Sequence, residues 1–397
     1  MDWADLPGDL LTTVSALLAV PGRICLRAVC RAWRAAIKEE EAAAMPSPWV
    51  IIPRTGGFSD SFTVLSAPTM NFFQWTPPGG VRARCVGSNG SWLAIVTAVD
   101  VETVAMSLVN PLTDARVELP LITTTMYSRC LFNPDPSHVE WGMNSLVQKV
   151  AFSPSPTAQD YTAAYVSNAT TELLCARAGT DGWHLLAEIP SGDCMNFIKQ
   201  DLDVAYHDGK FYYMVTSGQV WVADMTAPSP SPVPLAVLEP PLPTMVYLER
   251  GFHLAFSGDG ALHVVWSLND GHGCTMAQTC PDMLLTRYDP ASGFFSPWTT
   301  PLTSMGGWAF FIGDRNQSMS VPVDGSTATW LRPDYVYFTN TPLSELYAFG
   351  RRGLWAFDLV TGRIGWPRGE NEILEKQLES ELDVHWDKSL WLMPSFT

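Results

Sequence analysis

The residues of this chain that could carry out chemistry are few and widely spaced. Its seven histidines stand at positions 138, 184, 207, 253, 263, 272 and 385, and no pair has the HxxxH or HExxH spacing of a metal site. His272-Gly273-Cys274 with Cys280 matches no ordinary zinc pattern. A P-loop, a Gly-x-Gly-x-x-Gly loop and a Gly-x-Ser-x-Gly elbow are also missing from the sequence. We therefore expect no metal, no cofactor and no catalytic residue, so that the protein is not an enzyme.

The aspartates follow a pattern that favours turns over catalysis. Asp-Gly pairs and one Asn-Gly pair recur between strand-like runs, and such pairs favour the positive φ angles of tight hairpins. They begin at Asn89, Asp181, Asp208, Asp259, Asp270 and Asp324. Asp289 and Asp358 each open an Asp-x-x-x-Gly turn, and Asn110 ends a similar strand. A propeller enzyme or carbohydrate binder stays an alternative, and a deep axial pocket with convergent charges would mark it.

The elements that carry these turns are short β-strands. From residue 49 onward the period changes to two, and short β-rich runs stand between turn signals, as in Ser91-Trp92-Leu93-Ala94-Ile95-Val96 after Asn89-Gly90. About 350 residues of such meander fit a six- or seven-bladed β-propeller at roughly 40–50 residues per blade. A tandem β-sandwich is the alternative, with its linker in the proline-rich stretch 227–243, which we interpret instead as a polyproline-like surface loop. The tryptophans at strand positions are expected in the core: Trp92, Trp183, Trp221, Trp266 and Trp355. The stretch 370–383 is expected to form a short amphipathic helix.

The first 45 residues have a helical period instead. Apolar residues recur at steps of three and four in two runs separated by Pro21-Gly22, the second run carrying Leu26, Val29, Cys30, Trp33 and Ile37 on one stripe. Pro46-Ser47-Pro48 cannot continue a helix and is predicted to be a linker. A unit this small seldom stabilises itself, and its apolar residues exceed what short helices can hide. It either docks on another protein or packs on the C-terminal domain. We accordingly divide the chain into a helical domain, 1–45, and a β domain, 46–397.

Composition and charge indicate which classes of partner the protein is unsuited to bind and in which cellular compartment we expect it. The chain has 397 residues and a formal net charge of −16, which disfavours binding to nucleic acid or to an anionic membrane surface. No apolar run is long enough to span a bilayer, and Asp2, Asp5 and Asp9 stand where a secretory signal would be basic. Eight scattered cysteines fit a reducing compartment. We expect a cytoplasmic or nuclear protein.

The helical region resembles an F-box. The residues that carry the resemblance are Leu6-Pro7-x-x-Leu10-Leu11-x-x-Val14 and Leu26-x-x-Val29-Cys30-x-x-Trp33-Arg34. In that family the helices bind the Skp adaptor of cullin-based ubiquitin ligases. The resemblance implies the following adaptor-binding residues: Leu6, Pro7, Leu10, Leu11, Val14, Leu18, Leu26, Val29 and Trp33. Ser15 and Gly22 depart from the pattern, which usually has a bulky apolar residue and an acidic cap there.

The rest of the chain resembles the KIB-type β-propeller that follows the F-box in a large plant family. Matching stretches include Val150-Ala151-Phe152-Ser153, Tyr335-Val336-Tyr337-Phe338-Thr339 and Gly353-Leu354-Trp355, and together they run through most of residues 87–397. The resemblance implies a non-catalytic substrate receptor: the helices bind a Skp adaptor and through it a cullin, and the propeller recruits an unidentified protein target. The alternative is a scaffold or inhibitor that binds its target without ubiquitin transfer.

Overall fold

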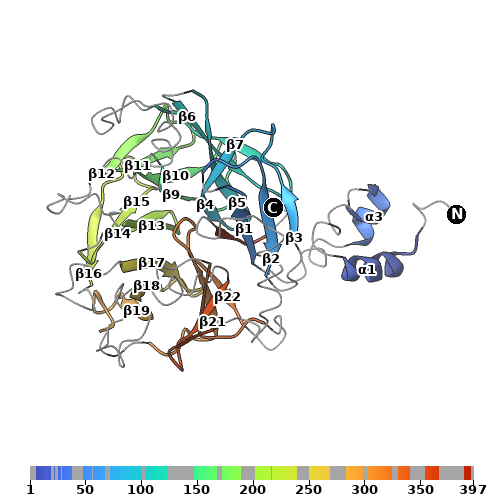
Figure 1. The fold of residues 1–397 in the computed structure, drawn as a ribbon. Coiled ribbons are helices and arrows are strands. Elements are labelled where there is room, and N and C mark those ends of the chain that lie inside the picture. The colour runs from blue at the N-terminus through green and yellow to red at the C-terminus, as the bar shows by residue number, and fades with distance from the viewer. Residues whose placement is uncertain are drawn as a thin grey trace.

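The period-two segments form strands, and the strands form six radially arranged sheets, a six-bladed β-propeller, in this computed structural model (Figure 1). The mainly β fold class is thereby confirmed, the blade number is six, and the tandem sandwich is wrong. The structure describes residues 6–18, 22, 26–27, 29–37, 48–55, 57–67, 72–100, 103–123, 147–167, 172–188, 202–215, 217–238, 250–268, 283–297, 300, 302–323, 330–339, 354–365 and 389–394.

The first three blades each contain four or five strands. Blade 1 is β26 (Leu390–Leu392), β1 (Trp49–Pro53), β2 (Phe62–Ser66) and β3 (Phe72–Trp75). Blade 2 is β4 (Ala83–Asn89), β5 (Trp92–Ala98) and β6 (Thr103–Val109), with β7 (Arg116–Glu118) and β8 (Ile122–Thr123) both pairing with β6. Blade 3 is β9 (Lys149–Phe152), β10 (Thr162–Val166), β11 (Glu172–Arg177) and β12 (His184–Glu188).

The last three blades follow the same plan with one exception. Blade 4 is β13 (Leu202–His207), β14 (Lys210–Val215), β15 (Gln219–Asp224) and β16 (Val233–Val237). Blade 5 is β17 (Arg250–Phe256), β18 (Leu262–Leu268), β19 (Met283–Asp289) and β20 (Phe294–Phe295). Blade 6 has the order β22 (Met319–Pro322), β21 (Trp308–Ile312), β23 (Tyr335–Phe338), β24 (Trp355–Asp358) and β25 (Arg363–Gly365), and its β21–β23 pair is parallel.

The ring is closed by the C-terminal strand. β26 pairs antiparallel with β1, so that Trp49 lies opposite Leu392 and Ile51 opposite Leu390. β26 also packs against β4, the inner strand of blade 2. Trp391 is fully buried, and its indole Nε1 donates to the Ile312 carbonyl of blade 6 at 3.0 Å. This one strand therefore joins blades 6, 1 and 2.

The aspartates have the turn-forming role predicted for them. Asp208 and Gly209 both have positive φ, 46° and 74°, in the tight turn between β13 and β14. Asp289 opens the turn after β19: its carboxylate accepts from the Ala291 amide at 3.0 Å, and its carbonyl accepts from the Gly293 amide at 2.9 Å. Asp358 makes the same two kinds of bond in blade 6. The Asp-Gly pairs at Asp270 and Asp324 lie outside the described residues.

Most of the predicted core tryptophans are buried. Trp92, Trp183, Trp266 and Trp355 lie in hydrophobic clusters within and between the blades. Trp221 is the exception, because its ring is half-exposed and stacks on Tyr213 with ring centroids 6.3 Å apart. β15 is the third strand of its blade, farther from the axis, and part of the Trp221 side chain meets solvent.

Two predictions of local structure were wrong. The proline-rich stretch 227–243 is not simply a loop, because residues 233–237 form β16, the outer strand of blade 4. Proline is tolerated there since an edge strand leaves one row of backbone groups without a ladder partner. The second helical run is not continuous: Cys30 is extended (φ −158°) and caps a new helix through a Trp33 N–H to Cys30 Sγ contact of 3.4 Å. The expected helix at 370–383 and most of the linker lie outside the described residues.

Candidate functional site: an apolar helical face and a pocket in blade five

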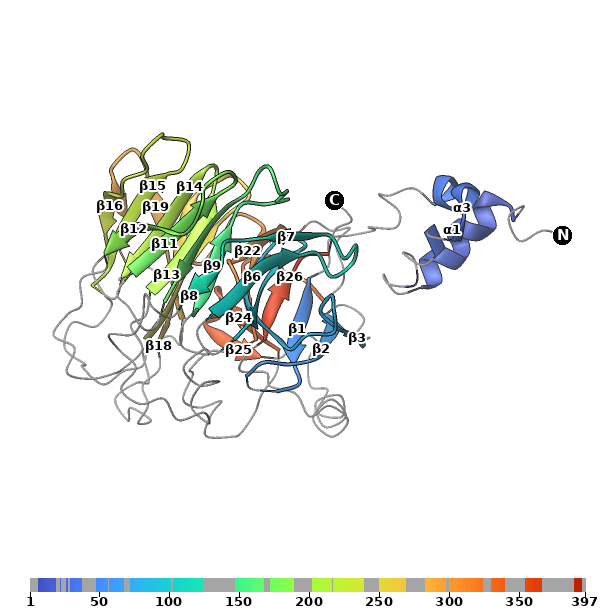
Figure 2. The same ribbon diagram turned by 90° about the horizontal axis from the view of Figure 1, so that it is seen from above.

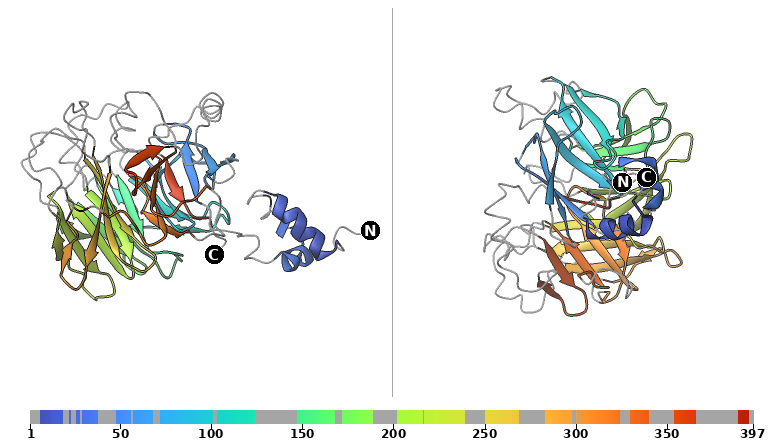
Figure 3. Two further views of the ribbon diagram at one scale, coloured as in Figure 1. Left: turned by 90° about the horizontal axis from the view of Figure 1, so that it is seen from below. Right: turned by 90° about the vertical axis from the view of Figure 1, so that its right-hand side faces the viewer.

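The N-terminal region forms a small helical segment of its own. α1 (Gly8–Leu17) packs on α3 (Arg31–Ala36), and the described residues Gly22, Leu26, Arg27 and Val29 are helical between them. Leu11 and Ile37 are buried at the centre, with Leu6, Leu26, Trp33 and Ala36 partly buried around them. Figures 1 and 2 and the left view of Figure 3 show the two N-terminal helices beside the propeller, away from its sheets.

One face of α1 is apolar and exposed. Leu10, Val14 and Leu17 are 50%, 45% and 83% exposed. Their spacing of four and three residues places them on one stripe of the helix. Val29, 60% exposed, belongs to the same segment. An exposed apolar stripe of this kind on so small a unit is typical of a protein interaction surface.

The nine residues predicted to bind an adaptor differ in accessibility. Pro7, Leu10, Val14 and Val29 are exposed. Leu6, Leu18, Leu26 and Trp33 are half-buried, and Leu11 is buried between α1 and α3. The structure thus separates residues that can meet a partner from one that holds the helices together. The binding role itself stays a prediction.

The two departures from the F-box pattern are both accommodated by packing inside the segment. Ser15 is buried, and its carbonyl accepts the Leu18 amide at 3.0 Å as α1 ends. A Cβ on Gly22 would lie 3.2 Å from Leu18 Cβ. Since that contact is already tight, a larger acidic side chain at position 22 would require Leu18 to move. Neither departure lies in the exposed stripe.

The centre of the propeller is crossed by the β21–β22 connection. Gln317 donates its backbone N–H to the Ser88 carbonyl of blade 2 at 3.2 Å. Its side-chain amide accepts from the Tyr206 N–H at 2.9 Å and donates to the Tyr206 carbonyl at 2.7 Å, in blade 4. A residue from blade 6 that bonds to blades 2 and 4 must lie on the axis. At this level the axis is therefore filled by protein.

The charged groups near the axis hold the ring together. Lys149 of β9 and Asp203 of β13 form a buried ion pair. Asp203 Oδ2 also accepts from the Leu254 N–H at 2.6 Å, which extends the network to β17. His253 lies beside it, and burial lowers the pKa of its imidazole. Because these groups bond to one another across three inner strands, we assign them to the interior of the scaffold.

Two of the described thiols, those of Cys85 and Cys175, are poorly suited to nucleophilic chemistry. Burial raises the pKa of Cys85 to about 12 and also raises that of Cys175. A thiol that stays protonated is a weak nucleophile.

Among the residues that the structure describes, no group of three or more metal-binding side chains gathers. The described residues also include no helix that is long and apolar enough to cross a membrane.

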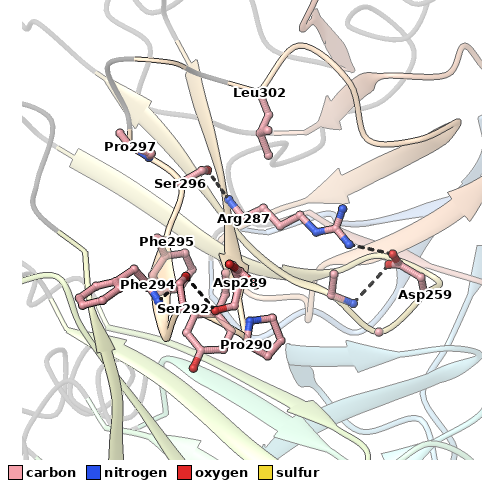
Figure 4. A pocket seen from close by; sticks show the side chains of 13 residues that line it. Asp259, Arg287, Asp289, Pro290, Ser292, Phe294, Phe295, Ser296, Pro297 and Leu302 are labelled. Carbon is pink, nitrogen blue, oxygen red and sulfur yellow. Dashed lines mark hydrogen bonds and ion pairs between the residues drawn. The ribbon is translucent and has the colours of Figure 1, made fainter.

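A second candidate site is a pocket of about 660 Å³ in the outer half of blade 5 (Figure 4). Arg287 of β19 lies at its centre, with Leu302 and Pro297 on one side and Asp289 and Pro290 on the other. Arg287 Nη2 donates to Asp259 Oδ2 at 3.0 Å.

Sequence reasoning missed this pocket. It identified the turns at Asp259 and Asp289 but gave no role to Arg287, Phe294 or Leu302. The walls come from two parts of the chain, residues 259–261 and residues within 287–297 with Leu302, so no local spacing could have indicated them.

Comparisons with known proteins agree with the propeller. The family model of the KIB1-4 beta-propeller matches residues 64–360. A protein of Arabidopsis thaliana named "F-box protein At1g10110" is 24% identical over 240 residues, 57% of this chain. The chain spans 56% of that relative's length.

Solved structures give more distant matches. A structural genomics protein of unknown function from Bacteroides thetaiotaomicron has a TM-score of 0.37 and 11% identity, covering 80% of this chain and 68% of its own. A protein from Lactobacillus plantarum has a TM-score of 0.38 and 12% identity, covering 63% of this chain and 65% of its own.

Proposed function

The chain belongs to the KIB1-4 β-propeller family, and from that premise we propose that it is a substrate receptor of a Skp–cullin–F-box ubiquitin ligase. The helical segment docks on a Skp-type adaptor, and the propeller binds the protein to be modified. The observation that carries the proposal is the exposed stripe of Leu10, Val14 and Leu17 on a helical segment separate from the propeller. A relative named as an F-box protein supports it.

In this proposal the chain is non-catalytic and works in the cytoplasm or nucleus. Other subunits transfer ubiquitin, and the receptor raises the concentration of target lysines near the conjugating enzyme. The raised thiol pKa values and the turn-forming aspartates are in keeping with a binding role. A rigid six-bladed ring suits this task, because loops on a rigid scaffold can vary without loss of the fold.

Co-purification with a recombinant Skp-type adaptor tests the proposal. The double variant Leu10→Asp, Val14→Asp places two charges in the exposed stripe and leaves the Leu11–Ile37 contact in place, so we expect it to lose the adaptor while the helices stay folded. Val233→Asp with Val360→Asp is the matched control, because both valines are exposed on the propeller. If the wild type fails to retain the adaptor, or the double variant retains it as well as the control does, the proposal is wrong.

A further inference from the structure

The blade 5 pocket lies on a rim of the propeller that the topology defines. In blades 2 to 5 the inner strand ends at the first hairpin turn of the blade. Because neighbouring strands are antiparallel, the third strand runs in the same direction as the inner strand and ends on the same side of the ring. We call this the turn rim; Figure 2 shows the ends of these strands on one side of the ring. The turns 257–261 and 289–293 of blade 5 both belong to it and wall the pocket.

The pocket offers hydrogen-bond donors next to apolar walls. Arg287 is about half exposed, and the side-chain bond described for its guanidinium is the single one to Asp259. A guanidinium carries five N–H donors, so donors beyond the one bonded to Asp259 remain for a ligand at the pocket. Leu302 points toward it from above (Figure 4). This combination suits a peptide, whose backbone carbonyls accept hydrogen bonds while its side chains cover apolar surface.

Apolar surface lines the pocket and lies beside it on blade 4. Phe294 of β20 is 68% exposed, although it is a large aromatic side chain. The outer strand of blade 4, β16, packs against β20 and exposes Val233 and Val237. Phe294 and the two valines are therefore exposed apolar side chains on adjacent outer strands of blades 5 and 4.

The charge around the pocket is negative. Asp259 and Asp289 face one guanidinium, and hydrogen bonds lower the pKa of both carboxyl groups, from Ser257 for Asp259 and from the Ala291 amide for Asp289. The neighbouring turn of blade 4, in which Asp208 follows His207, lies close by, since His207 Nε2 is 3.5 Å from where a Cβ on Gly260 would be. A cationic side chain at the pocket's edge would be attracted, and an anionic one would be repelled.

We propose that this pocket binds an extended peptide segment of a partner protein in which an apolar side chain is flanked by lysine or arginine. The apolar side chain enters between Leu302 and Pro290, and the Arg287 guanidinium donates to the peptide backbone. The flanking cation lies beside Asp289. Calling this partner the ubiquitination target rests on the function proposed above; the peptide site itself does not.

A phage-displayed library of random nonapeptides, selected on the full-length protein, tests the proposal. We expect the wild type to enrich peptides with a basic residue next to a large apolar one. Phe294→Ser removes the exposed ring, and Asp289→Asn removes a charge but keeps an oxygen for the Ala291 amide. The strongest peptide, labelled and measured by fluorescence anisotropy, should bind each variant about tenfold more weakly.

The control variants are closely matched. Val360→Ser removes a side chain that is also 68% exposed, and Asp358→Asn neutralises the equivalent turn in blade 6. Both should bind the peptide as the wild type does. The Leu10→Asp, Val14→Asp variant should also bind it, which separates this site from the adaptor face. Enrichment of acidic peptides, no enrichment, or equal affinity in the pocket and control variants would overturn the proposal.

Discussion

Gly87 lies where the inner strands of blades 2 and 3 approach each other closely. A Cβ at this position would be 2.2 Å from the Val150 carbonyl oxygen, which belongs to the backbone and cannot rotate away. We predict that Gly87→Ala lowers the free energy of unfolding by about 2 kcal/mol or more. Gly182→Ala is the control, because a Cβ there meets nothing within 4 Å, and it should change stability by less than about 0.5 kcal/mol. Urea unfolding measures both; equal effects would show that the two blades do not approach as described.

His263 makes stability depend on pH. Burial lowers the pKa of its imidazole from 6.5 to about 4, and its Nδ1 lies 3.0 Å from the Ala261 carbonyl. The unfolded chain therefore binds a proton that the folded chain does not between these two values, and stability falls as the pH decreases through that window. We predict a loss of about 2 kcal/mol from pH 7 to pH 5 through this residue alone.

The variant His263→Asn isolates this contribution. Asparagine can keep a donor for the Ala261 carbonyl but does not titrate in this range. Its unfolding free energy should change less between pH 7 and pH 5 than that of the wild type, with a residual slope from His253, whose pKa burial also lowers. Parallel pH profiles for the variant and the wild type would contradict the assignment.

Residue types alone predicted the turns but not the pocket. Asp208, Asp289 and Asp358 could be identified because a turn is a local structure with a local signal. The pocket around Arg287 also needs Asp259, 28 positions earlier in the chain, and Leu302, 15 positions later. These residues come together only when blade 5 forms. The buried ion pair of Lys149 with Asp203 likewise joins two blades and leaves no local signal.

At the level of elements, β26 closes the ring. Trp391 fills the space between blades 1 and 6, with its ring edge-on to Phe311 at a centroid distance of 4.9 Å. Trp391→Ala removes this packing, and we predict a loss of about 3–5 kcal/mol. Trp221→Ala, at a half-exposed ring, should cost less than half as much. Thermal unfolding followed by near-ultraviolet circular dichroism compares them, and similar shifts for the two variants would argue against closure through β26.

The period of the sequence predicted strands well and interruptions poorly. The pattern of β-rich runs that directly follow a short turn gave the strands β5, β14 and β18 of blades 2, 4 and 5. It missed β16, since Pro234 argues against a central strand but not against an edge. It also missed the break at Cys30, where an extended residue replaces a helical turn and the sulfur caps α3.

At the scale of the whole molecule, the two proposed binding sites lie on different parts of the chain, the adaptor site on the helical segment and the peptide site on the propeller. The helical segment exposes an apolar stripe, and the propeller, joined by buried bonds across its axis, presents a pocket on the turn rim. Leu11 and Leu10 illustrate the division of roles within the segment, because neighbouring leucines are buried and exposed respectively. Sequence spacing predicted that the segment is apolar, but only the packing of α1 on α3 shows which side chains are accessible.

Isothermal titration of a purified Skp-type adaptor into the full-length protein tests the central claim most directly. The account predicts one-to-one binding with a negative heat-capacity change, because apolar surface is buried. It also predicts that Leu10→Asp with Val14→Asp weakens binding at least about a hundredfold, roughly 2.7 kcal/mol, while Phe294→Ser leaves it unchanged. Absence of binding by the wild type, or wild-type affinity in the double variant, would contradict it.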